Sequence, residues 1–399
     1  MKGDGHPYNL TWRALIMARS WKARPGGGNA YDLRELAGAF GDLGTLIPFL
    51  VGYITLSKMD PVGVLVSFGL CKICAGLYFK TPVPIQPMKA IGTAAISHAG
   101  TLPVGAIWAA GLFSGIFWLL MGLTGGVSWI AKITSRPVVL GLIMGLGLGF
   151  IREGVKMMGA DPLLAISAGV LTFILLSHER IPAMLVLLGV GALVAIVAEP
   201  TLLSELGRLS WHFRVPTFTL TQLSHNELIT GVFVLGLPQV ALTLGNAIIA
   251  TVEENNAVFP SRPITVKAVA IDHGIMNVVG SSLGGVPMCH GAGGMAAHVR
   301  FGARTGGALV ILGSVMLVLG LFFADSIATL FKLFPPALLG VILMFGGLEL
   351  VGGVQAHLPR KEDRYVMFLT AGVSTWNMGV GYLVGLLLGY AFQWGWLKA

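Results

Sequence analysis

Two glycine- and proline-marked stretches stand out in an otherwise apolar chain because their residues could hold an anion. One reads GGVPMCHGAGGMAAHVRFGARTGG, residues 284–307, and the other reads TPVPIQPMKAIGTAAIS, residues 81–97. Each stretch breaks the chain just before a short segment that predicts a helix, and the first N–H groups of such a helix have no partner inside it. Glycine lets a ligand approach those N–H groups closely. Two helix starts of this kind facing one another would form an anion site.

Ionisable side chains inside apolar runs are the next candidates. Burying a charge in a membrane is costly, so a residue of this kind is usually kept for a function. Asp42 lies in AGAFGDLGTLIPFL, where it predicts either a proton or cation site or a residue that orders a neighbouring helix. Lys89 follows Gln86 by three residues. It predicts either a positive charge beside the anion or an ion pair with Asp42.

A polar stripe occurs in GLPQVALTLGNAII, where Gln239, Thr243 and Asn246 recur at i, i+4 and i+7 on one helix face. The stripe predicts either the lining of a cavity or hydrogen bonds to a neighbouring helix. Cys289 and His290 precede the second short helix, but the sequence shows no close ligand cluster around them. We therefore expect no metal and no cofactor.

The composition places these segments in a membrane. The 399-residue chain is 55% hydrophobic and 11% charged, with a mean hydropathy of +0.80, whereas a soluble domain carries about 25% charged residues. Apolar runs of about 20 residues, each long enough to cross a bilayer as a helix, recur from Glu35 nearly to Trp396. Most Lys and Arg residues fall in the N-terminal arm and the predicted inner loops, so the net charge of +8 indicates orientation rather than nucleic-acid binding.

Two pairs of segments resemble one another at nearly one offset, which predicts an internal duplication. Val83-Pro84-Ile85 aligns with Val286-Pro287-Met288, and Pro137 in SRPVVLGLIMGLG aligns with Pro336 in PPALLGVILMFGG. An odd number of spans in each half would invert the second copy, as in many secondary transporters.

We therefore expect an all-α polytopic membrane protein with a 7+7 inverted repeat and about 14 transmembrane segments, of which the third and tenth are short half-helices. The predicted parts are a cytosolic arm 1–34, a first repeat 35–199, an amphipathic connector 200–225 and a second, inverted repeat 226–399, with no soluble C-terminal domain. The predicted spans are 35–56, 61–79, 86–99, 103–124, 134–151, 161–177 and 181–199, then 227–252, 264–283, 290–300, 305–323, 334–351, 364–376 and 378–397. Asp272 and His273 are expected near a membrane edge, where solvent would surround them.

Four segments together resemble the molybdate transporter family, which is related to the SulP sulfate and anion transporters. They are ELAGAFGDLGTLIPFL, PVPIQPMKAIGTAAIS, LPQVALTLGNAII and GVPMCHGAGGMAAHVRFGARTGG. The resemblance runs from about Glu35 to Trp396. It implies the uracil-permease-like fold, in which the third and tenth spans meet at the substrate. In that fold the core and gate domains are interleaved in sequence, and the core domain slides against the gate domain as an elevator.

The resemblance also assigns the pocket residue by residue. Gln86, Pro87, Met88 and Lys89 would open the third span, and Cys289 with His290, Gly291, Ala292 and Gly293 the tenth; Asp42 and Thr45 of the first span and Gln239, Thr243 and Asn246 of the eighth would complete the pocket. Ala292 stands where family members often carry serine. Alanine lacks the serine hydroxyl, so one side-chain donor is lost and the backbone amides remain.

The function that these features imply is secondary active transport of a tetrahedral oxyanion, most directly molybdate, by alternating access. A co-transported proton on Asp42 would make the protein a symporter. Sulfate or tungstate is the alternative substrate, and a nucleobase permease or an anion channel is a more distant alternative; no nucleophile–base arrangement indicates an enzyme. We expect an integral membrane protein with both termini cytosolic, in the plasma (inner) membrane if bacterial. Relatives of this fold often dimerise, so we also expect a homodimer.

Overall fold

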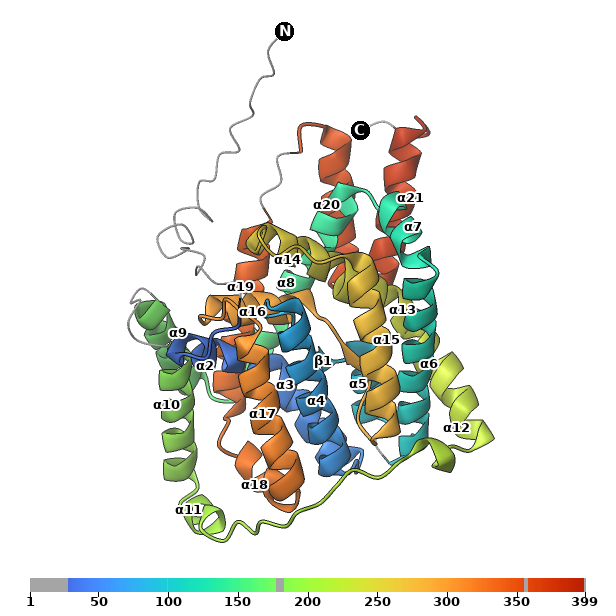
Figure 1. Cartoon of the computed structure of the whole chain (residues 1–399). Helices are drawn as coiled ribbons and strands as arrows, with labels where there is room; N and C mark the ends of the chain where they lie inside the picture. Colours follow the sequence, from blue (N-terminus) through green and yellow to red (C-terminus); the bar gives the residue numbers. More distant parts are fainter. Residues whose placement is uncertain (1–27, 99, 177–182, 355–357, 398–399) are drawn as a thin grey trace.

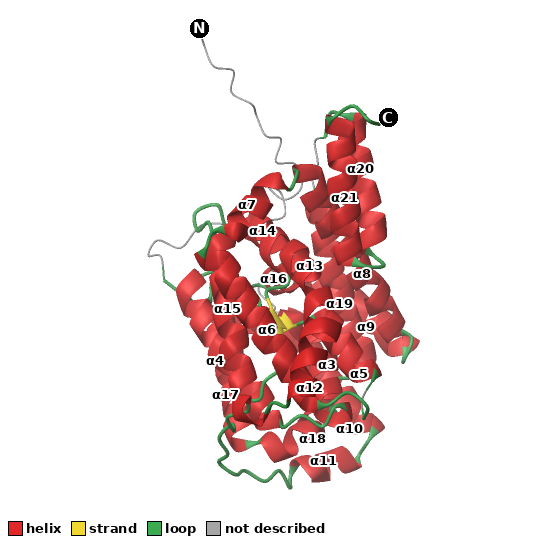
Figure 2. Cartoon of the chain, turned by 90° about the vertical axis from the view of Figure 1, so that its right-hand side faces the viewer, coloured by secondary structure: helices red, strands yellow, loops and turns green. Residues whose placement is uncertain are grey.

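The computed structural model describes residues 28–98, 100–176, 183–354 and 358–397, and forms a bundle of helices around one small pair of strands (Figures 1 and 2). Most of the predicted arm 1–34, namely residues 1–27, lies outside the described residues. Below, η marks a 3-10 or π-helical turn.

The elements before residue 207 are α2 (Leu33–Ala39), η1 (Phe40–Asp42), α3 (Leu43–Val51), η2 (Gly52–Leu56), α4 (Pro61–Phe79), β1 (Gln86–Pro87), α5 (Lys89–Ser97), α6 (Val104–Leu123), α7 (Gly126–Ile133), α8 (Arg136–Met158), α9 (Pro162–Leu176), α10 (Ala183–Ala198) and α11 (Thr201–Leu206). The elements that follow are η3 (Leu220–Gln222), α12 (His225–Ile229), η4 (Thr230–Gly236), α13 (Leu237–Leu242), η5 (Thr243–Ala250), α14 (Thr251–Val258), α15 (Val266–Ser282), β2 (Met288–Cys289), α16 (Ala292–Arg300), α17 (Gly307–Phe322), η6 (Ala324–Ser326), α18 (Ile327–Phe331), α19 (Pro336–Gly353), α20 (Lys361–Ser374) and α21 (Met378–Gln393).

The length and apolar character of the helices agree with a polytopic membrane protein. Among the described residues, four helical stretches could each cross a bilayer alone: Leu33–Leu56, Pro61–Phe79, Val104–Leu123 and Arg136–Met158. Gly307–Phe322 and Ala324–Phe331 make a fifth if they count as one span bent by 96°. Several other apolar helices are shorter. The number of fourteen crossings therefore stays a prediction.

Large apolar side chains on the outside of the bundle fit a lipid environment. Leu163 of α9 is 80% exposed, and Val197 of α10 and Leu387 of α21 are each 71% exposed. In water, such surfaces would be costly, whereas in a bilayer they face acyl chains.

Helices from the two halves of the chain pack in pairs, and glycine allows them to approach closely. α4 lies along α17, α6 along α15 and α8 along α19. Where α4 crosses α17, a Cβ on Gly69 would lie 2.8 Å from the Gly313 carbonyl, and one on Gly313 would lie 2.7 Å from the Gly69 carbonyl. Contacts this close leave no room for a side chain, as is typical of helix crossings in membranes.

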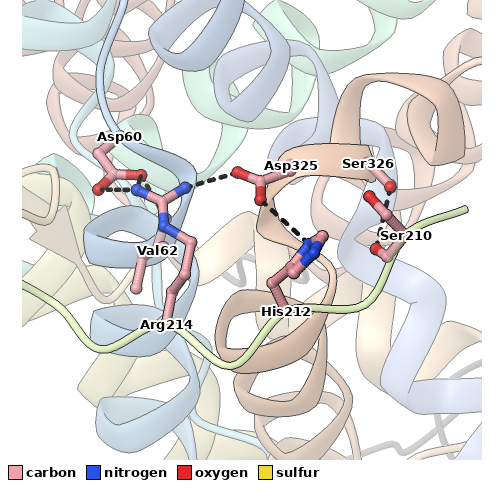
Figure 3. Close-up of polar contacts among 7 residues, drawn as sticks. All are labelled: Asp60, Val62, Ser210, His212, Arg214, Asp325 and Ser326. Atoms are coloured by element: carbon pink, nitrogen blue, oxygen red, sulfur yellow. Dashed lines mark hydrogen bonds and ion pairs between the residues drawn. The ribbon is translucent and has the colours of Figure 1, made fainter.

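The connector between the halves is a short helix followed by an extended strap. After α11, the chain runs along the bottom of the molecule in Figure 1 to α12. The backbone N–H groups of His212 and Arg214 donate to carbonyls at the end of α17. The Arg214 guanidinium binds Asp60 at 3.0 Å and Asp325 at 2.7 Å (Figure 3). The strap is thus tied to the starts of α4 and η6.

Three short helices, α7, α11 and α18, were not among the predicted spans. The prediction that solvent surrounds Asp272 and His273 was wrong for His273, which is 0% exposed. His273 is the next residue on α15 after Asp272, and it points inward, whereas the Asp272 side chain is 20% exposed.

Candidate functional site

The two broken segments meet at the strand pair in the middle of the bundle (Figure 2). β1 and β2 run antiparallel, with Gln86 opposite Cys289 and Pro87 opposite Met288. All four residues are buried. Since the strands are antiparallel, α5 and α16 leave the pair in opposite directions, so their N-termini lie on either side of one short ladder.

Backbone and side-chain hydrogen bonds fix this ladder. The Met88 N–H donates to the Pro287 carbonyl at 2.8 Å. From α15, the Asn277 amide donates to the Met288 carbonyl at 2.7 Å, and its oxygen accepts from the Met288 N–H at 2.8 Å. Asn277 thereby pairs with the buried Met288 backbone as a third strand would.

Neither of the two nine-residue helices has a side-chain cap. The residues that precede them, Met88 and Gly291, are extended, and neither supplies a side-chain cap. Two of those donors have partners: the Ala90 N–H donates to Gln239, and the Gly294 N–H donates to the Gly291 carbonyl. An uncapped helix start presents N–H groups and partial positive charge, which suit an anion.

Gln86 and Asp42 form the polar centre between these helices. The Gln86 amide nitrogen donates to one oxygen of Asp42, which belongs to η1 in the first helical stretch. Thr45 is buried one turn later. The other Asp42 oxygen and the Gln86 oxygen are buried without a hydrogen-bond partner among the described residues. Such unsatisfied atoms are costly in a finished core and mark a place where a ligand or water completes the site.

Two lysines place positive charge at this centre. The Lys72 side chain from α4 is 0% exposed, and its ammonium donates to the Ile85 carbonyl at 2.6 Å. The Lys89 ammonium is buried, lacks a hydrogen-bond partner among the described residues and lies 3.8 Å from the Phe150 ring centre. Both charges interact electrostatically with Asp42.

The predicted alternative of a Lys89–Asp42 ion pair is therefore wrong: no ion pair in the described part of the chain joins them, and the Lys89 ammonium lies on the Phe150 ring face. The centre holds two cations against one carboxylate, so it has an excess of positive charge.

The polar stripe of the eighth predicted span lies on the same centre. The Gln239 oxygen accepts from the Ala90 N–H at 3.1 Å, and its amide donates to Thr243 at 3.2 Å. Asn246 is 2% exposed, and its side-chain oxygen has no partner among the described residues. Thr243 and Asn246 stand on η5, a π-helical turn. Departures of this kind from α-helix geometry are frequent at functional sites.

The residues before and within α16 close the site from the other half. His290, Cys289 and Ala292 are buried. A Cβ on Gly294 would lie 2.5 Å from the Gln86 amide nitrogen, and a Cβ on Gly291 would overlap the Gln86 oxygen. A Cβ on Gly293 would overlap the Phe150 ring. These glycines bring the start of α16 against Gln86, where a side chain would not fit.

Lys72 and Asp272 also belong to the site, although neither was predicted from the sequence. Lys72 lies in the middle of the apolar run 61–79, so its charge at membrane depth was an available signal. Asp272 contacts His290 only through the fold, since the two stand 18 residues apart in sequence. In the described part of the chain, no three His, Cys, Asp or Glu side chains gather as a metal site requires.

A separate cavity of about 250 Å³ lies at the start of α4 and α6, lined by residues that include Lys58, Trp108 and Thr217. None of the candidate site residues lines it. The chemistry that we describe belongs to the centre at β1 and β2, where the polar side chains converge.

Comparison with known proteins places this arrangement in a family. A family model described as "Molybdate transporter of MFS superfamily" matches residues 34–150 and 231–350. Molybdate transporter 2 of Arabidopsis thaliana is 31% identical over 410 residues, covering 89% of this chain and 87% of that protein. Molybdate transporter 1 of the same plant is 28% identical, covering 91% of this chain and 88% of that protein.

A solved structure shows the same fold at low sequence identity. The murine Solute Carrier 26 family member A9 anion transporter, in its inward-facing state, superposes with a TM-score of 0.62 at 13% identity, covering 97% of this chain and 71% of that one. The matched segments contain Asp42, Gln86, Lys89 and His290. The chain belongs to the molybdate transporter family, whose named relatives are transporters and not enzymes.

Proposed function

We propose that this protein transports a tetrahedral oxyanion, principally molybdate, and binds it at the N-termini of α5 and α16. The observation that carries the proposal is the pair of buried ammonium groups of Lys72 and Lys89, which lie at the same polar centre as the Asp42 carboxylate. A divalent anion would compensate this charge, and charge-assisted hydrogen bonds from N–H groups would orient it.

The remaining pocket residues would supply hydrogen bonds and shape. Gln86, Thr45, Gln239, Thr243 and Asn246 would provide polar side chains around the anion. Pro87, Met88, Cys289, His290, Gly291, Ala292 and Gly293 would form the backbone cradle on both sides of the ladder. Ala292 has no hydroxyl, so the α16 side would bind through backbone amides.

The transport step would be elevator-type alternating access by a secondary active transporter. We assign residues 35–199 and 226–399 to two inverted repeats joined by 200–225, with core and gate domains interleaved. The pairing of α4 with α17, α6 with α15 and α8 with α19 supports this division, because each pair joins one helix from either repeat. Both termini would be cytosolic, the membrane would be the plasma (inner) membrane if the source is bacterial, and the protein would form a homodimer.

Asp42 is the candidate for proton coupling. It is 1% exposed, and one of its oxygens has no hydrogen-bond partner among the described residues. An anion that enters against an inside-negative potential needs a driving ion, and a carboxyl group inside a membrane is a common proton carrier. The expected result for Asp42→Asn is uptake with a weaker pH dependence than that of the wild type, and an unchanged pH dependence would contradict the role.

Uptake by purified protein in liposomes tests the function itself. Labelled molybdate should accumulate, and competition with sulfate, tungstate and uracil should rank tungstate and sulfate above uracil. Uracil as the strongest competitor would favour a nucleobase permease. Molybdate current without coupled proton movement would favour a channel.

A further inference from the structure

A histidine–carboxylate contact lies directly behind the candidate anion site. His290 is 0% exposed, and its Nε2 atom lies 3.0 Å from Oδ2 of Asp272, whose side chain is 20% exposed. On the opposite edge of the ring, Nδ1 lies 3.0 Å from the Pro84 carbonyl oxygen. His290 thus bridges α15 to the segment that leads into β1.

These two contacts indicate where His290 and Asp272 could bind a proton between them. A carbonyl oxygen only accepts hydrogen bonds, so the Nδ1 atom facing Pro84 must carry a hydrogen. A neutral ring with hydrogen on Nδ1 has a lone pair on Nε2, and that lone pair would face the oxygen of a carboxylate. Nε2 and Oδ2 are both buried and neither has a hydrogen-bond partner among the described residues, although they lie 3.0 Å apart, so one further proton on either atom would make the contact attractive. The geometry of Asp272 and His290 is therefore suited to binding one further proton between them.

We infer that the Asp272–His290 pair is a second proton-binding site of this transporter, distinct from Asp42, that takes up a proton with the anion and releases it on the other side of the membrane. The inference rests on the proposed function for its coupling role. The proton comes from solvent through the partly exposed carboxyl group and returns to solvent, so no other reactant is needed.

The side chains nearest to the Asp272–His290 pair are mostly uncharged. His273 from α15 faces the His290 ring at 6.0 Å between centroids, and Phe79 from α4 faces it at 6.1 Å. The Cys71 thiol of α4 interacts electrostatically with Asp272. Lys72, the next residue on α4, extends to the Ile85 carbonyl instead. Aromatic surroundings screen charge weakly, so an unpaired charge is unfavourable here.

The pair is connected to both sides of the anion site. His290 directly precedes Gly291, the residue before α16, and its carbonyl accepts from Thr251 at 2.8 Å. Pro84, bound through Nδ1, lies two residues before Gln86. Without the proton, lone pairs on Nε2 of His290 and Oδ2 of Asp272 would face each other and repel. We expect the His290 ring to shift in response, and this shift would displace the segments that contact it before β1 and α16. An anion at Gly291 would in turn favour the protonated, more positive pair.

Accumulation and exchange in liposomes distinguish coupling from transport. Each coupled proton should change the accumulation ratio about tenfold per pH unit of gradient, since about 1.4 kcal/mol corresponds to tenfold. We expect Asp272→Asn to lose one such factor of about ten while retaining molybdate exchange at equal pH, and Asp272→Glu to restore part of it. The control is Glu253→Gln, an exposed carboxylate on α14, which should behave like the wild type.

Accumulation by Asp272→Asn at the wild-type level would overturn the inference. His290→Gln should show the same loss, and Asp272→Asn decides the matter if His290→Gln does not fold. If the wild type exchanges no molybdate, the proposed function fails. The proton site is then tested without substrate by infrared difference spectra recorded across pH: a titrating carboxyl band that Asp272→Asn removes supports the site, and an unchanged spectrum refutes it.

Discussion

A single methyl group at Gly294 should weaken anion binding strongly while leaving the fold intact. Gly294 is the third residue of α16 and faces Gln86. In Gly294→Ala the new Cβ would lie 2.5 Å from the Gln86 amide nitrogen and 2.8 Å from the Pro84 Cβ. The amide would have to retreat by about 0.9 Å to reach ordinary van der Waals contact at 3.4 Å.

This displacement determines the expected magnitude. The same nitrogen donates to Asp42, and a hydrogen bond to a charged group contributes about 1.5–3 kcal/mol. The displaced amide no longer holds Asp42 in place at the proposed anion site, and we expect the Kd for molybdate to rise roughly 10- to 150-fold, as an equal loss of binding free energy would give. Alanine favours helix by about 1 kcal/mol over glycine, so the stability of α16 itself should not suffer.

Calorimetric titration of the detergent-purified protein with molybdate measures the effect. Gly149→Ala in α8 is the matched control, because nothing lies within 4 Å of the added Cβ. We expect both variants to elute as the wild type does, with the Kd changed only in Gly294→Ala. A Kd for Gly294→Ala within twofold of the wild-type value would refute the placement of Gln86 and α16 at the anion.

Three further substitutions test the charges around the site and the strap. Lys89→Met removes a buried cation and should raise the Kd for molybdate roughly 30-fold (about 2 kcal/mol), with Lys89→Arg closer to wild type in the same titration; equal affinities would contradict a role for this charge. Lys72→Met leaves the Ile85 carbonyl without its donor and should lower the free energy of unfolding by about 1–3 kcal/mol in addition to weakening binding, as thermal unfolding in detergent would measure. Arg214→Ala should lower stability by about 1 kcal/mol or less, and only at low salt, because its ion pairs are partly exposed; a larger, salt-independent loss would show that the strap does more than hold two carboxylates.

The helices could be predicted from the sequence more accurately than the segments that lie beside them in the fold. The predicted span 61–79 coincides with α4, because Asp60 caps its start, Pro61 occupies its first position and Lys80 ends it in a left-handed conformation. The short segments 86–99 and 290–300 shrink to α5 and α16; Gln86 and Pro87 form β1, and β2 ends directly before His290. The pairing of Gln86 with Cys289 joins residues 203 positions apart, which no local pattern encodes.

The side-chain contacts of the site were harder to predict than its residue types. Asp42, Gln86 and Lys89 were recognised as unusual for a membrane, but their partners depend on rotation about each helix. The 3-10 turn that carries Asp42 and the π-helical turn that carries Asn246 alter that rotation locally. His273 was misplaced for the same reason: one residue along α15 separates a partly exposed side chain from a fully buried one.

The most direct test of the central claim is calorimetric binding of molybdate to the purified wild type and to Gln86→Ala, with sulfate as competitor. The account predicts molybdate binding that resists excess sulfate and weakens at least tenfold in Gln86→Ala, since the variant loses the hydrogen bond that joins Asp42 to the anion site. Binding of equal strength in both proteins, or no binding of either oxyanion to the wild type, would contradict it.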